Sequence, residues 1–324
     1  MAAGKDARAT VARASLLGAI RCQSLLACQA AARPLDSSAM LTVGILANPR
    51  MTGALQALLA LRAALEARGC CPVLDLQTAA MVGGAGGIPA SEFARRVDLA
   101  AVLGGDGTML DALSRLGDFA KPVAGINIGR LGFLTSCTDA ELDAFAAAVT
   151  EGRFTTSVRS LLEATIFRAG RAERSFVALN EVALARGETG RLVAVRASVN
   201  GELLNHYRAD GLIVATPTGS TAYSLSAGGP LIEPAAAVFV ITPICPHSLS
   251  QRSLVLADDA VVEIAPEAAD GGPMLFTADG RDTTHIETGD RIEVRKSLRS
   301  LRLLMLEDRS FYQALRQKLR WQGL

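Results

Sequence analysis

The pattern of apolar residues up to about residue 152 predicts strands that alternate with helices. Residues 54–68 carry leucines on one face at helical spacing. A further helix is expected up to about Val149, opened by a capping box over 138–141. Alternation of this kind is typical of a Rossmann-like parallel sheet with right-handed crossovers. The apolar runs of strand length are 41–47, 72–76, 99–103 and 123–126.

After about residue 152 the apolar positions follow the period of a strand instead. Asn200-Gly201 predicts a tight hairpin turn between two of these strands. Closely spaced strands favour an antiparallel, β-rich domain, and residues 310–319 return to a helical pattern. The predicted strands are 161–167, 175–184, 192–199, 202–207, 211–216, 237–242, 261–265 and 291–294.

The chain is expected to divide into four parts. Its 324 residues, 50% of them hydrophobic, exceed what one ordinary core needs. We expect an α/β domain over 40–152, a β-rich domain over 153–296 and a C-terminal segment over 297–324. Residues 1–39 are rich in Ala and Arg and poor in acids, so a poorly ordered extension is expected. A transit peptide and a start of the folded protein at Met40 are the alternatives.

Composition and charge narrow the classes of function. Lys and Arg number 33 against 32 Asp and Glu, and aromatic residues make up 4%, so nucleic-acid binding is not expected. No apolar run reaches the roughly 18 residues of a membrane helix. The six cysteines form no CxxC pair, so neither a zinc site nor a disulfide framework is expected. A reducing, cytoplasmic location is the simple interpretation.

The most informative segment is the turn Gly104-Gly105-Asp106-Gly107-Thr108, which follows the predicted strand 99–103. Glycine lets a ligand approach the backbone closely, and parallel sheets bind ligands at the carboxyl ends of their strands. The turn is neither a Walker loop nor a dinucleotide fingerprint. Taken alone, it leaves open a ligand-binding turn or a structural one in which Asp106 caps the next helix.

Further motifs follow this turn in a fixed order. They are Gly-Ile-Asn at 125–127, Leu-Gly-Phe-Leu-Thr at 131–135, Asn-Glu-Val at 180–182, the segment 210–230, Thr-Pro-Ile-Cys-Pro-His-Ser-Leu-Ser at 242–250 and Asp-Gly-Arg at 279–281. From about Leu41 to Trp321 the chain resembles the NAD kinase family, within a superfamily that includes diacylglycerol kinases and 6-phosphofructokinases. The stretch Thr216–Pro230 is the most specific part of this resemblance.

The resemblance implies transfer of the γ-phosphate of ATP to the 2′-hydroxyl of the adenosine ribose of NAD, which makes NADP. It implies Mg²⁺ or another divalent cation bound with ATP, and a last helix that packs back on the first domain. The expected partners are NAD and ATP, with polyphosphate open as a donor, and further copies of the chain in a dimer or tetramer. A lipid kinase with the same glycine turn and a non-catalytic NAD-binding sensor are the alternatives.

The same resemblance assigns the site residues. Asp106 is the expected catalytic base, and Asp279 is a second candidate for contact with the reacting centre, with a turn residue as its alternative. Asn180 and Glu181 suit ribose hydroxyls, because a carboxylate accepts hydrogen bonds and an amide both donates and accepts. Tyr223 offers a ring for stacking. The other expected substrate-binding residues are Gly107, Arg191, Arg208, Asp210, Thr221, Ala222, Ser224, Leu225, Ser226 and Arg281, with a surface ion pair as the alternative for Arg208 and Asp210.

Overall fold

The structure is a computed structural model, and it describes residues 40–84, 86–129, 132–187, 192–267, 274–307 and 309–321. The expectations for residues 1–39 and for Arg191 lie outside these ranges. Among the described residues, no helix is long and apolar enough to cross a membrane.

The α/β half is built on four parallel strands in the order β2-β1-β3-β4. The strands β1, β3 and β4 are buried almost throughout, which explains their continuous apolar runs. The hydrophobic pattern therefore predicted this sheet correctly. The strands are β1 (Thr42–Ala47), β2 (Cys71–Leu74), β3 (Leu99–Leu103) and β4 (Val123–Asn127), and the short β5 (Cys137–Thr138) pairs with β4.

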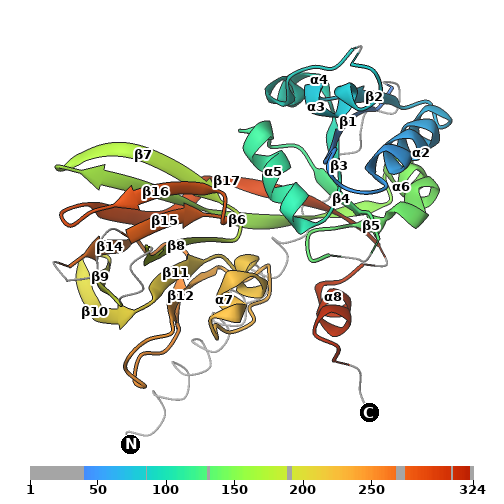
Figure 1. Cartoon of the computed structure of the whole chain (residues 1–324). Helices are drawn as coiled ribbons and strands as arrows, with labels where there is room; N and C mark the ends of the chain where they lie inside the picture. The colour runs from blue at the N-terminus through green and yellow to red at the C-terminus, as the bar shows by residue number, and fades with distance from the viewer. Residues whose placement is uncertain are drawn as a thin grey trace, which may run out of the picture. The chain divides into compact units, whose positions relative to one another are not determined.

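Helices cover both faces of this sheet (Figure 1). Alternate residues of β3 point to opposite faces, so Ala101 packs with α2 and α6 while Ala100 packs with α4 and α5. The predicted capping box is present at Thr138 and Glu141. The helices are α2 (Ala54–Glu66), α3 (Leu76–Ala80), α4 (Phe93–Arg96), α5 (Asp106–Leu116) and α6 (Leu142–Thr150), with 3₁₀ turns η1 (Ala90–Glu92) and η2 (Asp139–Glu141).

The β-rich half is a pair of packed layers. One layer is the antiparallel sheet β13-β12-β11-β8-β15-β16, and the other contains β10-β9-β14-β17 with β6 and β7. Between them lies an apolar core in which the rings of Phe176 and Phe276 are 5.1 Å apart. The strands are β6 (Phe154–Arg168), β7 (Arg171–Ala178), β8 (Glu181–Arg186), β9 (Val193–Val199), β10 (Glu202–Ala209), β11 (Gly211–Ala215), β12 (Val238–Ile244), β13 (Leu254–Ala257), β14 (Val262–Pro266), β15 (Met274–Ala278), β16 (Asp282–Ile286) and β17 (Arg291–Leu306).

Two strand predictions need correction. The single strand predicted over 175–184 is two strands, β7 and β8, because the chain turns at Leu179 and Asn180. The strand predicted over 291–294 continues to Leu306 as β17, which pairs with β6 and, at Leu303, runs parallel to β4. The antiparallel strands are therefore continuous with the parallel sheet. The boundary expected after residue 296 falls inside β17, where its pairing with β6 shifts register.

The C-terminal helix α8 (Phe311–Lys318) returns to the α/β half, as expected. The Ser310 side chain caps it by accepting a hydrogen bond from the backbone N–H of Gln313. The Phe311 ring lies 6.2 Å from the ring of Phe133. Near this helix, Arg309 forms an ion pair with Glu141 at the start of α6.

Two further short elements, the 3₁₀ turn η3 (Gly219–Thr221) and the helical turn α7 (Tyr223–Ser226), follow β11.

Candidate active site

Asp106 is the first residue of α5 and follows the carboxyl end of β3. Its Oδ2 accepts a hydrogen bond from the backbone N–H of Phe133 at 3.1 Å, and its Oδ1 accepts one from Leu134 at 3.0 Å. The helix N-cap is Gly105, so the Asp106 side chain does not cap its own helix. The carboxylate is instead fixed from outside by a loop that follows β4.

Two glycines make room for this arrangement. Gly104 has φ of +150°, and a Cβ there would lie 2.3 Å from the Thr108 hydroxyl oxygen. A Cβ on Gly132 would lie 2.3 Å from Oδ1 of Asp106. Any side chain at either position would therefore displace the start of α5 or the carboxylate itself.

Asp279 stabilises the turn between β7 and β8, although it lies far from this turn in the sequence. Its carboxylate accepts hydrogen bonds from the backbone N–H groups of Leu179 at 2.9 Å, Asn180 at 2.8 Å and Glu181 at 3.2 Å. Burial raises the pKa of Asp279, while these three N–H groups act against that shift. Asp279 adopts φ of +50° to do this. In this arrangement the side chain supports the turn that carries Asn180 and Glu181.

Glu181 presents a buried carboxylate that is only half satisfied. The side chain accepts a hydrogen bond from the backbone N–H of Tyr223, but its Oε2 has no partner among the described residues. Burial, followed by the charge of Asp279, raises the pKa of Glu181 to about 7. Because a buried polar atom without a partner is costly, this oxygen is suited to accept a hydrogen bond from a ligand.

The hydroxyl-rich segment after β11 packs directly on this turn. A Cβ on Gly219 would lie 2.0 Å from the carbonyl oxygen of Asn180, so only glycine allows the contact. The Tyr223 side chain is 43% exposed, and Ser226 is exposed with Thr221, Ala222 and Leu225 partly so. Ser224 is fully buried and its hydroxyl lies 2.9 Å from that of Thr242, so its role at a ligand stays a prediction.

Arg208 and Asp210 do not form the surface ion pair that was the alternative to a ligand-binding role. Asp210 forms its ion pair with Arg186 at 3.4 Å, whereas Arg208 is exposed on β10. Burial, followed by the charges of Cys245, Asp210 and Glu181, raises the pKa of the Tyr223 phenol. Sequence reasoning missed Arg186, because the pairing of β8 with β11 brings it to Asp210.

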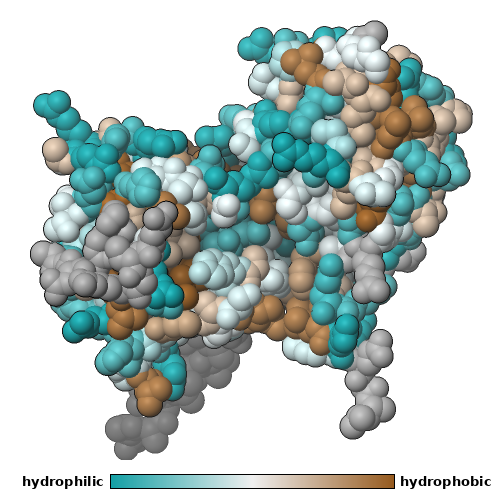
Figure 2. Space-filling model, in the orientation of Figure 1, coloured by the Kyte–Doolittle hydropathy of each residue, from teal (hydrophilic) through white to brown (hydrophobic). Residues whose placement is uncertain are grey.

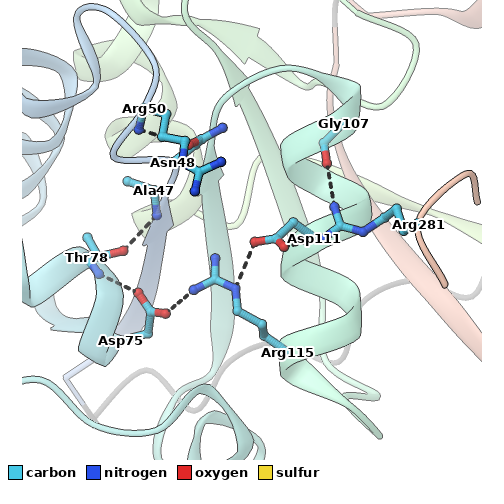
Figure 3. Close-up of polar contacts among 9 residues, drawn as sticks. All are labelled: Ala47, Asn48, Arg50, Asp75, Thr78, Gly107, Asp111, Arg115 and Arg281. Atoms are coloured by element: carbon cyan, nitrogen blue, oxygen red, sulfur yellow. Dashed lines mark hydrogen bonds and ion pairs between the residues drawn. The ribbon is translucent and has the colours of Figure 1, made fainter. Parts of the chain in front are cut away.

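Arg281 connects the turn after β15 to α5 (Figure 3). Its Nη1 donates to the carbonyl oxygen of Gly107 at 3.4 Å, and its Nη2 pairs with the Asp111 carboxylate. Asp111 also lies 3.0 Å from Nε of Arg115, and Arg115 pairs in turn with the buried Asp75. The structure therefore brings the turn after β15, which contains Asp279, next to the first turn of α5, which begins at Asp106. The roles of Gly107 and Arg281 in substrate binding stay predictions.

The α/β fold and the glycine turn that carries Asp106 at the end of β3 are typical of a phosphotransferase. Two family models match the chain: the ATP-NAD kinase N-terminal domain over residues 90–154 and the ATP-NAD kinase C-terminal domain over residues 179–306. The chain belongs to the NAD kinase family. The resemblance, the fold class and the kinase activity predicted from the sequence are thereby confirmed.

Individual relatives agree over nearly the whole chain. An NAD kinase of Chlorobium luteolum is 43% identical over 278 residues, which cover 86% of this chain and 96% of that protein. An NAD kinase of Nitrosospira multiformis is 39% identical over 290 residues, covering 89% and 98%. Yeast NADH kinase complexed with NADH superposes with a TM-score of 0.80 at 25% identity, covering 90% of this chain and 93% of the other. An Archaeoglobus fulgidus NAD kinase in complex with ATP has a TM-score of 0.67 at 25% identity, covering 87% and 100%.

Proposed function

We propose that the protein transfers the γ-phosphate of ATP to the 2′-hydroxyl of the adenosine ribose of NAD and so makes NADP. The observation that carries this proposal is the fixed carboxylate of Asp106 at the carboxyl end of β3, in a chain whose relatives are NAD kinases. Proton removal from the attacking alcohol is one of the tasks of a kinase site. Asp106 performs it, with its orientation set by the N–H groups of Phe133 and Leu134.

In this proposal, residues of the β-rich half bind NAD. The unpaired Oε2 of Glu181 accepts a hydrogen bond from an adenosine-ribose hydroxyl, and the neighbouring Asn180 amide adds a second polar contact. The half-exposed ring of Tyr223 stacks on adenine. Thr221, Ala222, Leu225 and Ser226 present the small and polar surface around it.

A divalent cation enters with the donor. Mg²⁺ is commonly bound by one or two carboxylates together with substrate phosphates. Asp106, at the start of α5, is the carboxylate that would hold it, because both oxygens of Asp111 are paired with Arg281 and Arg115. When bound, the cation would neutralise charge on the phosphates. Asp106 then keeps its task of accepting the proton.

The test is a product assay on the purified full chain with NAD, ATP and MgCl₂. A dehydrogenase that accepts only NADP reports the product, and inorganic polyphosphate replaces ATP in a parallel reaction. NADP formation supports the proposal. Lipid phosphorylation without NADP would favour the lipid kinase, and NAD binding without turnover on either donor would favour the sensor.

Three wider expectations belong to the same proposal: a cytoplasmic location, a homo-oligomer, and the four-part division of the chain. Light scattering on the purified protein measures whether it is a dimer or a tetramer. A chain that begins at Met40 tests the dispensability of residues 1–39 by its melting temperature and NADP formation. A large loss in either would show that the extension is needed by the enzyme.

A further inference from the structure

The C-terminal helix α8 contacts the loop that holds Asp106. The Phe311 ring, on the first turn of α8, packs against the Phe133 ring with 6.2 Å between the ring centroids. The backbone N–H of the same Phe133 donates to Oδ2 of Asp106. The loop is closed on itself, because the Gly132 N–H donates to the Thr135 hydroxyl oxygen at 2.7 Å. A displacement of the Phe133 ring is therefore carried to the hydrogen bonds of the carboxylate.

The next residue of α8 contacts the β-rich half. The Tyr312 phenol donates a hydrogen bond to the Glu233 carboxylate. Glu233 follows Ile232, whose backbone N–H donates to the hydroxyl oxygen of the buried Ser220 at 3.0 Å. Ser220 comes directly before the NAD segment, residues 221–226, which holds the residues proposed above to surround adenine. Adjacent side chains of one helix therefore reach the loop of the catalytic base and the flank of the NAD segment.

The start of α8 is itself held in place. Ser310 caps the helix. The Arg309 side chain is only 18% exposed and forms an ion pair with Glu141, which belongs to the capping box before α6. The rings of Phe311 and Tyr312 stand edge to face, 5.8 Å apart. The helix is therefore a fixed support for both contacts rather than a loose end of the chain.

The two contacts lie on different halves of the molecule. On the face shown in Figure 2, the surface is hollowed between the halves, and hydrophilic residues gather in the hollow. A substrate that spans such a hollow is placed only as precisely as its two walls are held. The strands β6, β17 and β4 join the halves through the sheet. α8 adds a second connection, which is made of side chains.

We propose that α8 sets the distance between the catalytic base and the bound NAD. Phe311 is a positioning residue for Asp106, acting through Phe133. Tyr312 is a positioning residue for the NAD segment, acting through Glu233. This assignment rests on the proposed function. The base must lie within hydrogen-bond reach of the ribose hydroxyl, and a misplacement of about 1 Å can cost about a hundredfold in rate. Neither side chain contacts a substrate in this assignment, so both act on kcat rather than on binding.

The first test is Phe311→Leu in the full chain. We expect kcat for NADP formation to fall about tenfold, because the Phe133 loop loses its support. The dissociation constant for NAD and the KM for ATP should stay the same, and Phe311→Tyr, which keeps the ring, should recover most of the loss. Phe167→Leu removes a partly buried ring from β6 in the β-rich half and is the matched control. An unchanged kcat, or weaker NAD binding at the same kcat, would overturn the role of Phe311.

A general loss of structure is separated from positioning by repeating the change in Asp106→Asn. Because Phe311 acts through Asp106, Phe311→Leu should lower the residual turnover of that variant by less than about twofold. A tenfold loss in both backgrounds would overturn the positioning role. Calorimetric titration with NAD counts the binding sites of each variant, so partial unfolding is recognised by the stoichiometry.

The second contact is tested by Tyr312→Phe, which removes one exposed hydroxyl. We expect kcat to fall about threefold, as for loss of a single hydrogen bond. Glu233→Ala should have the same effect, and the double variant should be no worse than either single one. Tyr207→Phe on β10 is the matched control. Additive losses would mean that the two side chains do not act through their hydrogen bond. If the parent protein makes no NADP, the proposed function itself fails, whereas NADP formation that neither α8 variant changes removes only the role of α8.

Discussion

The two halves of the molecule use a carboxylate in opposite ways. In the α/β half, both oxygens of Asp106 accept backbone N–H groups, so the side chain is satisfied before any ligand arrives. In the β-rich half, Glu181 is 7% exposed and keeps one oxygen without a partner. A fixed, satisfied carboxylate suits a role in the chemical step. An unsatisfied one is suited to be completed by a substrate.

The surroundings of each carboxylate explain this difference. Asp106 stands at the edge of a parallel sheet, where loops with free backbone N–H groups converge. Glu181 begins β8 inside an antiparallel sheet, where the backbone N–H groups are used in strand pairing. The neighbouring turn is already held by Asp279. Variants at the two positions should therefore separate turnover from binding.

The largest effect is expected for Asp106→Asn. The amide keeps the shape of the side chain but cannot take the ribose proton, so turnover should fall by about 10²–10⁴-fold. NAD binding should survive, because Glu181 and Tyr223 remain. Steady-state NADP formation and calorimetric titration with NAD measure the two quantities. Near-normal turnover would mean that another group is the catalytic base, with Asp279 as the next candidate.

The opposite pattern is expected for Glu181→Ala. Loss of charge-assisted hydrogen bonds worth roughly 1.5–3 kcal/mol should weaken NAD binding by about one to two orders of magnitude. Tyr223→Ala should weaken it in the same direction by removing the ring from adenine. Neither change should alter which hydroxyl is phosphorylated, which NMR of the product can verify. If both variants bind NAD as tightly as the parent in calorimetry, the dinucleotide lies elsewhere.

Local sequence patterns predicted the α/β half better than the β-rich half. Buried strands such as β3 appear as uninterrupted apolar runs, and a glycine turn marks their ends. The strand pairs of the other half depend on register, and an edge strand such as β16 is too exposed to show an apolar pattern. Strand β16 was missed for this reason, whereas β13 (Leu254–Ala257) and β15 (Met274–Ala278) were missed although both are apolar. The tail of β17 was missed as well, because Leu298 and its neighbours are polar or exposed around the register shift.

The site shows the same division between local and long-range information. Motifs identified Asp106, Glu181 and Tyr223, since each lies in a short, distinctive segment. The contacts that give them their environment join distant residues: Asp279 reaches Asn180 across 99 positions, and Arg281 reaches Asp111 across 170. No local pattern predicts such pairs without the fold. Asp111 in particular is an ordinary polar residue on a helix until Arg281 is placed beside it.

The smallest expected effect, and the one that tests the comparison most finely, is the pH dependence of NAD binding. Glu181 must be ionised to accept ribose hydroxyls fully, and burial raises its pKa to about 7 from 4.5. Affinity for NAD should therefore increase by up to about tenfold between roughly pH 6 and pH 8. The same shift means that the folded protein binds the proton more tightly than the unfolded chain, so the free energy of unfolding falls as pH rises between 4.5 and about 7. Calorimetric titration at several pH values, with Glu181→Gln as the control that cannot ionise, measures the effect. A parent protein whose affinity is flat with pH, or a Gln variant with the same slope, would show that the ionised oxygen of Glu181 does not meet the ribose.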